Sequence, residues 1–198
     1  MSFRKEKKVK LSKSESEIIK IKLSNLGMEK LYPKRYTSSC YFDSKDLMCF
    51  HESEEGVLPR RKIRIRWYDN KPNFLKEEKI SSIEGRFKTS KKINQISFSD
   101  IFNLEINSKY YGLLKPSLIV NYQREFYTYL GARITFDKNI NYLNPRSLTK
   151  NKFYDPESVM EIKTTTNVSD DFLSTILPFP ESRFSKYCRG ILSQQGVI

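Results

Sequence analysis

The feature that most constrains the fold of this chain is the alternation of charged and apolar residues in "RRKIRIRWY", residues 60–68. Successive side chains of a β-strand point to opposite faces, so residues two apart share a face. One face of this strand carries Lys62, Arg64 and Arg66, and the other carries Ile63, Ile65 and Trp67. The strand therefore needs an apolar core on one side, and water or an anionic partner on the other.

The same division recurs on further segments that have the composition of strands. The polar faces carry Arg4, Glu6 and Lys8; Glu77 and Lys79; Tyr122 and Arg124; Arg133, Thr135 and Asp137; and Glu161 and Lys163. For one strand alone, a solvated face of a half-exposed sheet is the simpler interpretation. Repetition over six strands, with many arginines and Glu-x-Lys pairs, weakens that interpretation, and the alternative is a closed barrel with a charged interior. Such an interior is stable only if its cations pair with carboxylates or with a bound anion.

The remaining patterns predict an α+β fold in which antiparallel pairs dominate, with a barrel or a strongly curved sheet packed by a few helices. Capping boxes at Ser12 with Glu15, or at Ser14 with Glu17, predict a helix that ends at Gly27. Strands are expected at 3–10, 35–44, 60–68, 73–81, 117–129, 132–140 and 158–166, and closing helices at 169–177 and 182–194. Residues 45–56 are expected to form a short helical or irregular connection.

Composition limits the class of protein and its partner. The 198 residues fit a single domain, 1–198, and 36 Lys and Arg against 23 Asp and Glu give a net charge of +13. The expected partner is therefore a polyanion. No apolar run approaches the roughly 20 residues of a transmembrane helix, and no secretory signal is present, so a cytoplasmic location is expected.

Cysteine and histidine offer little chemistry. Cys40, Cys49 and Cys188 lack the spacing of a metal site, and their odd number argues against a disulfide framework. His51, the one histidine, is expected to be an exposed turn residue. Zinc chemistry and Ser-His or Cys-His catalysis are therefore disfavoured.

A series of motifs resembles one family along essentially the whole chain. The motifs, in order, are "FRKEKKV", "YFDSKDLMCF", "RRKIRIRWY", "LKEEK", "YQREFY", "ARITFDKNI", "VMEIKTT" and "SRFSKYCRGI". Each is weak alone, but together they resemble the VTC domain, the polyphosphate-polymerase branch of the triphosphate tunnel metalloenzymes, which are related to CYTH proteins. The resemblance implies an antiparallel β-barrel tunnel, lined by basic and acidic side chains, that binds triphosphate with Mn²⁺ or Mg²⁺.

The resemblance also implies roles for individual residues. Those expected to bind phosphate are Lys8, Lys62, Arg64, Arg66, Lys79, Lys92, Tyr122, Arg124, Arg133, Lys163, Arg183, Ser185 and Lys186. Arg64, Arg66 and Lys186 are the expected catalytic residues among them, and Glu161, with Glu6 as a second carboxylate, is the expected metal ligand. One of Lys88, Lys91 and Lys92 is expected to contact the substrate at a tunnel mouth, unless the segment is a solvated basic loop.

The implied activity is a metal-dependent phosphotransferase of the polyphosphate polymerase type. It would transfer the γ-phosphate of a nucleoside triphosphate, ATP by expectation, to a growing polyphosphate chain. Hydrolytic relatives carry Glu-x-Glu-x-Lys in the first strand, whereas this chain has "RKEKK", residues 4–8. The alternatives are a triphosphate hydrolase and a non-catalytic polyphosphate- or nucleotide-binding module. Nucleic acid is not expected as a partner, because Trp67 lies opposite the cations of its strand.

Overall fold

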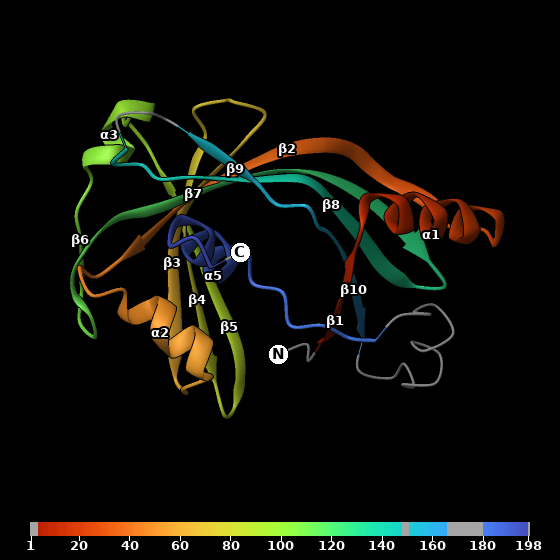
Figure 1. The fold of residues 1–198 in the computed structure, drawn as a ribbon, viewed down its shortest axis with the longest axis horizontal. Helices are drawn as coiled ribbons and strands as arrows, with labels where there is room; N and C mark the ends of the chain where they lie inside the picture. The colour runs from red at the N-terminus through yellow and green to blue at the C-terminus, as the bar shows by residue number, and fades with distance from the viewer. Residues whose placement is uncertain (1–3, 148–150, 166–179, 198) are drawn as a thin grey trace. The chain divides into compact units, whose positions relative to one another are not determined.

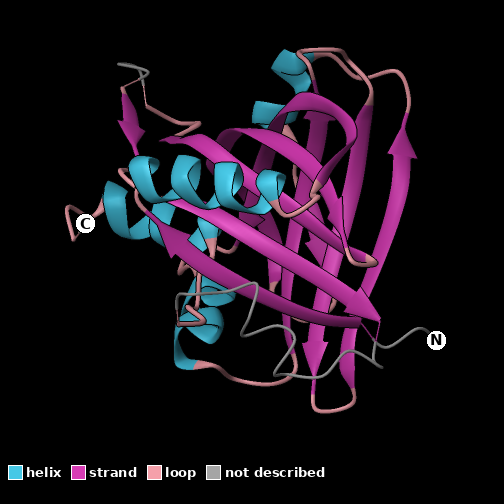
Figure 2. Cartoon of the chain, turned by 90° about the vertical axis from the view of Figure 1, so that its right-hand side faces the viewer, coloured by secondary structure: helices cyan, strands magenta, loops and turns pink. Residues whose placement is uncertain are grey.

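Antiparallel strands make up most of the described chain, as predicted, and the helices beside them are short (Figure 2). The computed structural model describes residues 4–147, 151–165 and 180–197. The strands are β1 (Arg4–Leu11), β2 (Glu29–Asp43), β3 (Arg60–Tyr68), β4 (Phe74–Ser82), β5 (Gly85–Ile93), β6 (Ile106–Ser108), β7 (Gly112–Tyr129), β8 (Ala132–Leu143), β9 (Lys152–Tyr154) and β10 (Ser158–Thr165). The helices are α1 (Lys13–Asn25), α2 (Met48–Glu55), α3 (Phe98–Asn103) and α5 (Lys186–Gln194). None of these helices combines the length and apolar composition needed to span a membrane.

The strand order is β1-β10-β8-β7-β2-β3-β4-β5, with β6 beside β7 and β9 beside β8 (Figure 1). The pairs β1–β10, β10–β8, β2–β3, β3–β4 and β4–β5 are antiparallel. The turn between β3 and β4 contains Asp69 and Asn70 in the left-handed region, at φ 50° and 55°. Asn and Asp tolerate that conformation better than most residues, so the tight turn lets β3 and β4 pair as a hairpin.

Local sequence signals explain where several elements begin and end. Ser12 and Glu15 form the first of the two predicted capping boxes, because the Ser12 hydroxyl accepts from the Glu15 amide at 3.1 Å and the Glu15 carboxylate accepts from the Ser12 amide at 2.7 Å. Helix α5 begins at Lys186, four residues later than predicted, because the Ser185 hydroxyl accepts the Cys188 amide and caps the helix there. The helix expected at 169–177 lies outside the described residues.

Other boundaries differ from the predictions. Residues 85–93 form strand β5, paired with β4 from Ser82↔Gly85 to Phe74↔Ile93, where a basic loop was one of the expectations. Its lysines follow no alternation with apolar residues, so the pattern gave no signal for the strand. Strand β2 begins at Glu29 instead of residue 35. His51 is exposed as predicted but lies within helix α2, not in a turn. The three cysteines are free, as expected.

The chain divides into two compact units. The first comprises Met1–Arg35, Tyr122–Ile140 and Asp155–Phe184. Its core lies where α1 packs on the apolar faces of β1, β8 and β10, and includes Val9, Ile19, Leu23, Ile134, Phe136, Met160 and Ile162. Ile18 and Leu26 of the same segment are exposed, whereas Ile19 and Leu23 are buried. The prediction of one domain over 1–198 stays a prediction.

The second unit comprises Tyr36–Asn121, Asn141–Tyr154 and Ser185–Ile198. Its core includes Ile63, Ile65 and Trp67, so the apolar face of "RRKIRIRWY" is buried as predicted. Trp67, Phe74 and Phe98 pack edge to face, with ring centroids 5.1–5.9 Å apart. The opposite face of β3 therefore carries the cations Lys62, Arg64 and Arg66.

Gly190 of α5 gives a prediction about this second core. Alanine normally stabilises a helix interior by about 1 kcal/mol relative to glycine, but a Cβ here would lie 2.4 Å from Leu118 Cδ2 and 2.7 Å from Tyr142 Cδ1. Both neighbours are buried, and overpacking costs about 1–3 kcal/mol. We expect Gly190→Ala to lower the free energy of unfolding by about 1 kcal/mol or more, measured by urea denaturation. Gln194→Ala, at an exposed position of the same helix, is the control. A Gly190→Ala protein as stable as wild type would contradict this packing.

Candidate functional site

One group of charged residues lies on a single face of the second unit. The register places Tyr41 opposite Arg64, Arg64 opposite Glu77, and Ser39 opposite Arg66. In the next pair, Lys79 lies opposite Lys88, and Leu75 opposite Lys92. We call Ser39, Tyr41, Lys62, Arg64, Arg66, Glu77, Lys79, Lys88 and Lys92 the arginine cage. Its cations greatly outnumber its one carboxylate, so the face attracts anions.

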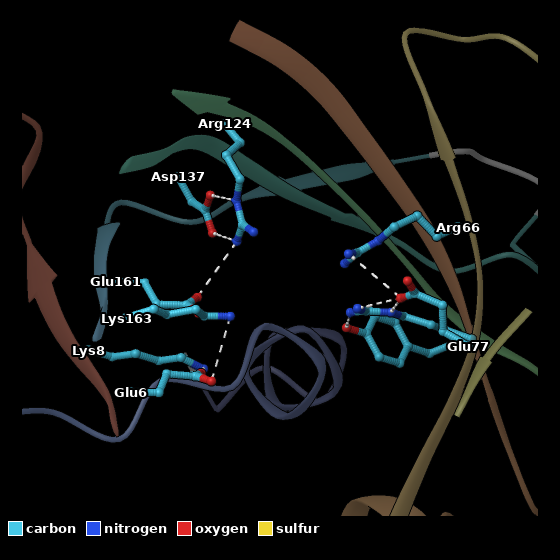
Figure 3. A network of polar contacts seen from close by, with 10 residues as sticks. Glu6, Lys8, Arg66, Glu77, Arg124, Asp137, Glu161 and Lys163 are labelled. Atoms are coloured by element: carbon cyan, nitrogen blue, oxygen red, sulfur yellow. Dashed lines mark hydrogen bonds and ion pairs between the residues drawn. The ribbon is translucent and has the colours of Figure 1, made fainter. Parts of the chain in front are cut away.

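Glu77 is the centre of the arginine cage. Its Oε2 lies 3.7 Å from Arg66 Nη1 (Figure 3). The same oxygen lies 2.8 Å from Arg64 Nε, and Oε1 lies 2.5 Å from Lys88 Nζ. Glu77 is only 3% exposed. Burial by itself opposes its ionisation, but the charges of Arg64 and Arg66 outweigh this and lower its pKa to about 2. Glu77 is therefore an anion at neutral pH that offsets part of the charge of the cage.

Strand β2 holds the two arginines from the other side. Arg64 Nη1 donates to the Tyr41 hydroxyl at 2.8 Å, and Arg66 Nε donates to the Ser39 hydroxyl at 3.1 Å. The Tyr41 ring stacks on Tyr187, with centroids 4.8 Å apart. Burial raises the pKa of Tyr41, but the charges of Arg64 and Arg66 lower it more strongly, to about 8. Both guanidinium groups are thus fixed in orientation, as recognition of a phosphate by an arginine fork requires.

The N-terminus of α5 lies beside the cage within the second unit. Lys62 Nζ donates to the Ser185 hydroxyl at 3.0 Å, and the same hydroxyl accepts the Cys188 amide. Lys186, an expected catalytic residue, is the first residue of this helix. Ser185, Lys186 and Lys62 therefore lie in the second unit near one another, while Arg183 belongs to a segment of the first unit. The role of each stays a prediction.

The register of β5 separates the three lysines of residues 88–92. Lys88 and Lys92 lie opposite Lys79 and Leu75, on the cage face. Lys91 lies opposite Lys76, and residues adjacent along a strand point to opposite faces. Lys88 and Lys92 are therefore the candidates for phosphate contact, and Lys91 is not.

A second charged group lies on one face of the first unit. Lys8, Glu161 and Thr135 are aligned across β1, β10 and β8, and Glu6, Lys163 and Arg133 are aligned beside them. We call Glu6, Lys8, Tyr122, Arg124, Arg133, Asp137, Glu161 and Lys163 the carboxylate cluster; six of its members are labelled in Figure 3. Apart from Arg183, which is not a member, these are the residues of the first unit that the resemblance assigned, with Asp137 added.

Ion pairs connect the members of the carboxylate cluster. Arg124 grips Asp137 through two nitrogens, at 2.5 Å and 2.7 Å, and its Nη2 lies 3.8 Å from Glu161. Lys163 Nζ lies 2.6 Å from Glu161 Oε1 and 3.7 Å from Glu6 Oε2. Burial raises the pKa of Glu161, but the positive charges of Arg124, Lys163 and Lys8 have the larger effect. They lower the pKa of Glu161 to well below its usual range. Glu161 is thus an ionised carboxylate although it is 6% exposed.

The donor set of the carboxylate cluster fits a hard divalent cation. Mg²⁺ prefers oxygen ligands and is commonly held by one or two carboxylates together with substrate phosphates. Glu161 and Glu6 supply such oxygens, and the Lys163 ammonium already lies between them as a positive charge. No group of three His, Cys, Asp or Glu residues within the described ranges forms a complete metal cage. Glu161 and Glu6 are therefore the residues of this cluster that could hold a divalent cation together with a phosphate.

Sequence reasoning missed the residues that orient the cations. Ser39 and Tyr41 were not singled out, and Glu77 and Asp137 were placed on the charged faces without a role. A period of two from Asp43 back along β2 puts Ser39 and Tyr41 on one face, so that signal was available. Their partners on β3 depend on the register between strands, which the sequence does not show.

Glu77 provides a prediction about stability in acid. Its pKa is lowered from 4.5 to about 2, so its stabilisation is full above pH 4.5 and is lost as the pH falls towards 2. We expect Glu77→Gln to cost about 3 kcal/mol at pH 7 and much less at pH 2.5, measured by urea denaturation at both pH values. Glu105→Gln, in the exposed pair with Lys115, should change stability little at either pH. An equal cost at both pH values would contradict the assigned pairing.

Solved structures show the same fold. A conserved hypothetical protein from Pyrococcus furiosus aligns with a TM-score of 0.59 at 12% identity, over 94% of this chain and 99% of its own. A putative adenylate cyclase from Vibrio parahaemolyticus aligns with a TM-score of 0.56 at 13% identity, over 97% and 98%. A putative adenylyl cyclase from Hippeastrum, described as having a dominant triphosphatase activity, aligns with a TM-score of 0.55 at 14% identity, over 99% and 97%. The predicted fold class, α+β with an antiparallel β-barrel tunnel, is therefore confirmed.

The family assignment follows from the sequence match. The VTC domain model matches residues 3–194, and the chain belongs to the VTC domain family. The resemblance carried by the eight motifs is thereby confirmed. No match is found among the curated proteins.

Proposed function

We propose that this protein is a metal-dependent phosphotransferase that transfers the γ-phosphate of a nucleoside triphosphate, ATP by preference, to a polyphosphate chain. The observation that carries the proposal is the excess of oriented cations in the arginine cage, where one buried carboxylate serves Arg64, Arg66 and Lys88. A linear chain of phosphates is the ligand that best matches several cations in rows along a sheet. Membership of the VTC domain family supports the proposal.

The proposed chemistry needs no covalent nucleophile. The arginine cage holds the β- and γ-phosphates, and its fixed guanidinium groups stabilise the charge that spreads over the transferred phosphoryl group. Lys186 and Lys62, beside the capping hydroxyl of Ser185, add positive charge for the same oxygens. The terminal oxygen of the polyphosphate acceptor attacks the γ-phosphorus, and the bond to the β-phosphate oxygen breaks as ADP leaves.

Glu161, with Glu6, would hold the divalent cation, Mn²⁺ or Mg²⁺. When bound, such a cation neutralises phosphate oxygens and helps to orient them. Arg124 and Lys163 keep Glu161 ionised, and Lys163 also pairs with Glu6, before the substrate arrives. The protein thus arranges its charges in advance, so that little reorganisation is needed during transfer.

A triphosphate hydrolase is the second candidate. The triphosphatase activity stated for the Hippeastrum protein of the same fold favours it. In that reaction water replaces the polyphosphate acceptor, while the demands on the arginine cage stay the same. The single carboxylate of "RKEKK", where hydrolases carry two, favours the phosphotransferase.

One experiment separates the candidates. Purified protein with ATP and Mn²⁺ should form acid-labile phosphate polymer and an equivalent amount of ADP, resolved by gel and by nucleotide chromatography. Release of orthophosphate from tripolyphosphate, without polymer, would identify the hydrolase. Tight tripolyphosphate binding without either reaction, across several nucleotides and metals, would identify a binding module.

A further inference from the structure

A cavity of about 260 Å³ lies in the second unit, lined by residues that have no place in the proposed reaction. Its walls come from the turn before α2, the middle of β7, the segment after β8 and the last turn of α5. We call it the polar pocket. Leu47, Pro116 and Ile191 supply its apolar surface, and the rest of the lining is polar or cationic.

Two exposed cations, Lys45 and Arg146, line the polar pocket. Neither the Lys45 ammonium nor the Arg146 guanidinium forms an ion pair or hydrogen bond with any residue in 4–147, 151–165 or 180–197. In the arginine cage, by contrast, Arg64 and Lys88 each pair with Glu77. Two positive charges that no described carboxylate offsets favour a ligand of charge −2 at this cavity.

The other polar groups of the pocket are suited to oxyanions. The side chains of Asn144, Gln194 and Gln195 line it and carry amide N–H₂ donors. The Asn144 side-chain oxygen accepts a hydrogen bond from the Arg146 backbone amide at 2.9 Å. This bond fixes the orientation of the Asn144 side chain, whose N–H₂ group is the donor. Arginine, lysine and primary amides together form a donor set, in which a tetrahedral oxyanion can bind through every oxygen.

The backbone beside the pocket is strained. Leu47 lies in the left-handed region, at φ 53° and ψ 41°, which is unfavourable for a branched side chain. The Asp43 carboxylate holds this turn by accepting the amides of Ser44, Cys49 and Phe50 at 2.8–3.0 Å. Strain that the surroundings enforce in this way is concentrated at binding sites.

The size of the cavity limits the ligand. Pockets for drug-sized molecules usually have about 300–1,000 Å³, so about 260 Å³ suits a smaller group. We propose that the polar pocket binds a small phosphate anion, orthophosphate or pyrophosphate, at a site separate from the arginine cage. This proposal does not depend on the proposed function, because it needs neither turnover nor a metal.

The experiment must keep the two sites apart. Ser117 lines the pocket and its hydroxyl donates to the Tyr41 carbonyl at 3.1 Å, so one residue links the pocket to the cage. Pyrophosphate binding should therefore be measured by calorimetry in the Arg64→Lys/Arg66→Lys protein, in which the cage forks are lost and the charge is kept. We expect pyrophosphate still to bind at the polar pocket of this protein, and adding Lys45→Ala/Arg146→Ala should weaken the remaining binding at least tenfold.

The control removes two equivalent charges elsewhere. Lys30→Ala/Lys34→Ala, at exposed positions of β2, changes the net charge equally and should weaken pyrophosphate binding less than twofold. Equal losses of pyrophosphate affinity in the two double variants would show that only general surface charge matters, and would overturn the proposal. Tighter binding of citrate than of pyrophosphate would overturn the phosphate assignment. If the cage variant does not fold, the side-chain amide NMR signals of Asn144, Gln194 and Gln195 in the wild-type protein test the proposal. The absence of any shift of these signals during a pyrophosphate titration would overturn the proposal.

Discussion

Replacing Arg64 by alanine should weaken tripolyphosphate binding by at least a hundredfold, and replacing it by lysine by at least tenfold. Alanine removes both charge and fork, whereas lysine keeps the charge and loses the paired N–H donors. Arg64 is held between Tyr41 and Glu77, so its orientation is fixed before the ligand arrives. Calorimetric titration with tripolyphosphate, without metal, measures the loss apart from any turnover.

Two control variants separate the loss of phosphate binding from other effects of the Arg64 substitution. Lys91→Ala removes a cation from the opposite face of β5 and should change the affinity less than twofold. Arg64→Ala also leaves the buried Glu77 with one partner fewer, which can destabilise the protein. The Arg64→Ala/Glu77→Gln protein removes that buried charge and should recover stability without recovering affinity. Wild-type affinity in Arg64→Ala would show that the arginine cage does not bind phosphate.

Glu161→Gln should reduce turnover at least a hundredfold and should also raise the concentration of Mn²⁺ needed for half-maximal activity. Glutamine keeps the volume of Glu161 but removes the negative charge that a divalent cation requires. Metal-free tripolyphosphate binding should be unchanged or slightly stronger, because Lys163 and Arg124 lose a competing carboxylate. Initial rates over a range of Mn²⁺ concentrations measure the effect.

A neighbouring carboxylate provides the control for Glu161. Glu157 pairs with Lys10 at 3.3 Å and lies just before β10, so Glu157→Gln tests loss of a charge at the same end of the chain. Its rate and metal dependence should match those of wild type. If Glu161→Gln had the metal dependence of the wild type, Glu161 would not be a metal ligand and the metal site would not be the carboxylate cluster.

The division into a charged and an apolar face was predictable, because the period of two follows from strand geometry alone. Ile63, Ile65 and Trp67 are buried, and Arg64 and Arg66 share the opposite face, as the sequence indicated. Strand β5 was not predicted as a strand, because pairing with β4 stabilises a lysine-rich segment that has no apolar pattern.

The partners of the cations could not be predicted for a different reason. Which carboxylate meets Arg124 depends on the side-by-side placement of β7 and β8, and which meets Lys88 depends on the pairing of β4 with β5. A shift of one residue would send each of these side chains to the other face. Motif resemblance identified the cations, but only coordinates show that Asp137 and Glu77 hold them.

Glu77 has a consequence for how the protein releases its product. A buried carboxylate that already occupies Arg64 and Lys88 competes with every phosphate that enters. Because Glu77 competes for the same cations, it weakens the binding of an anion to the arginine cage. Tight binding of an anion in the ground state does not by itself raise the rate of a reaction. We therefore expect the protein to let a long polyanion slide and depart, where a wholly basic surface would retain it.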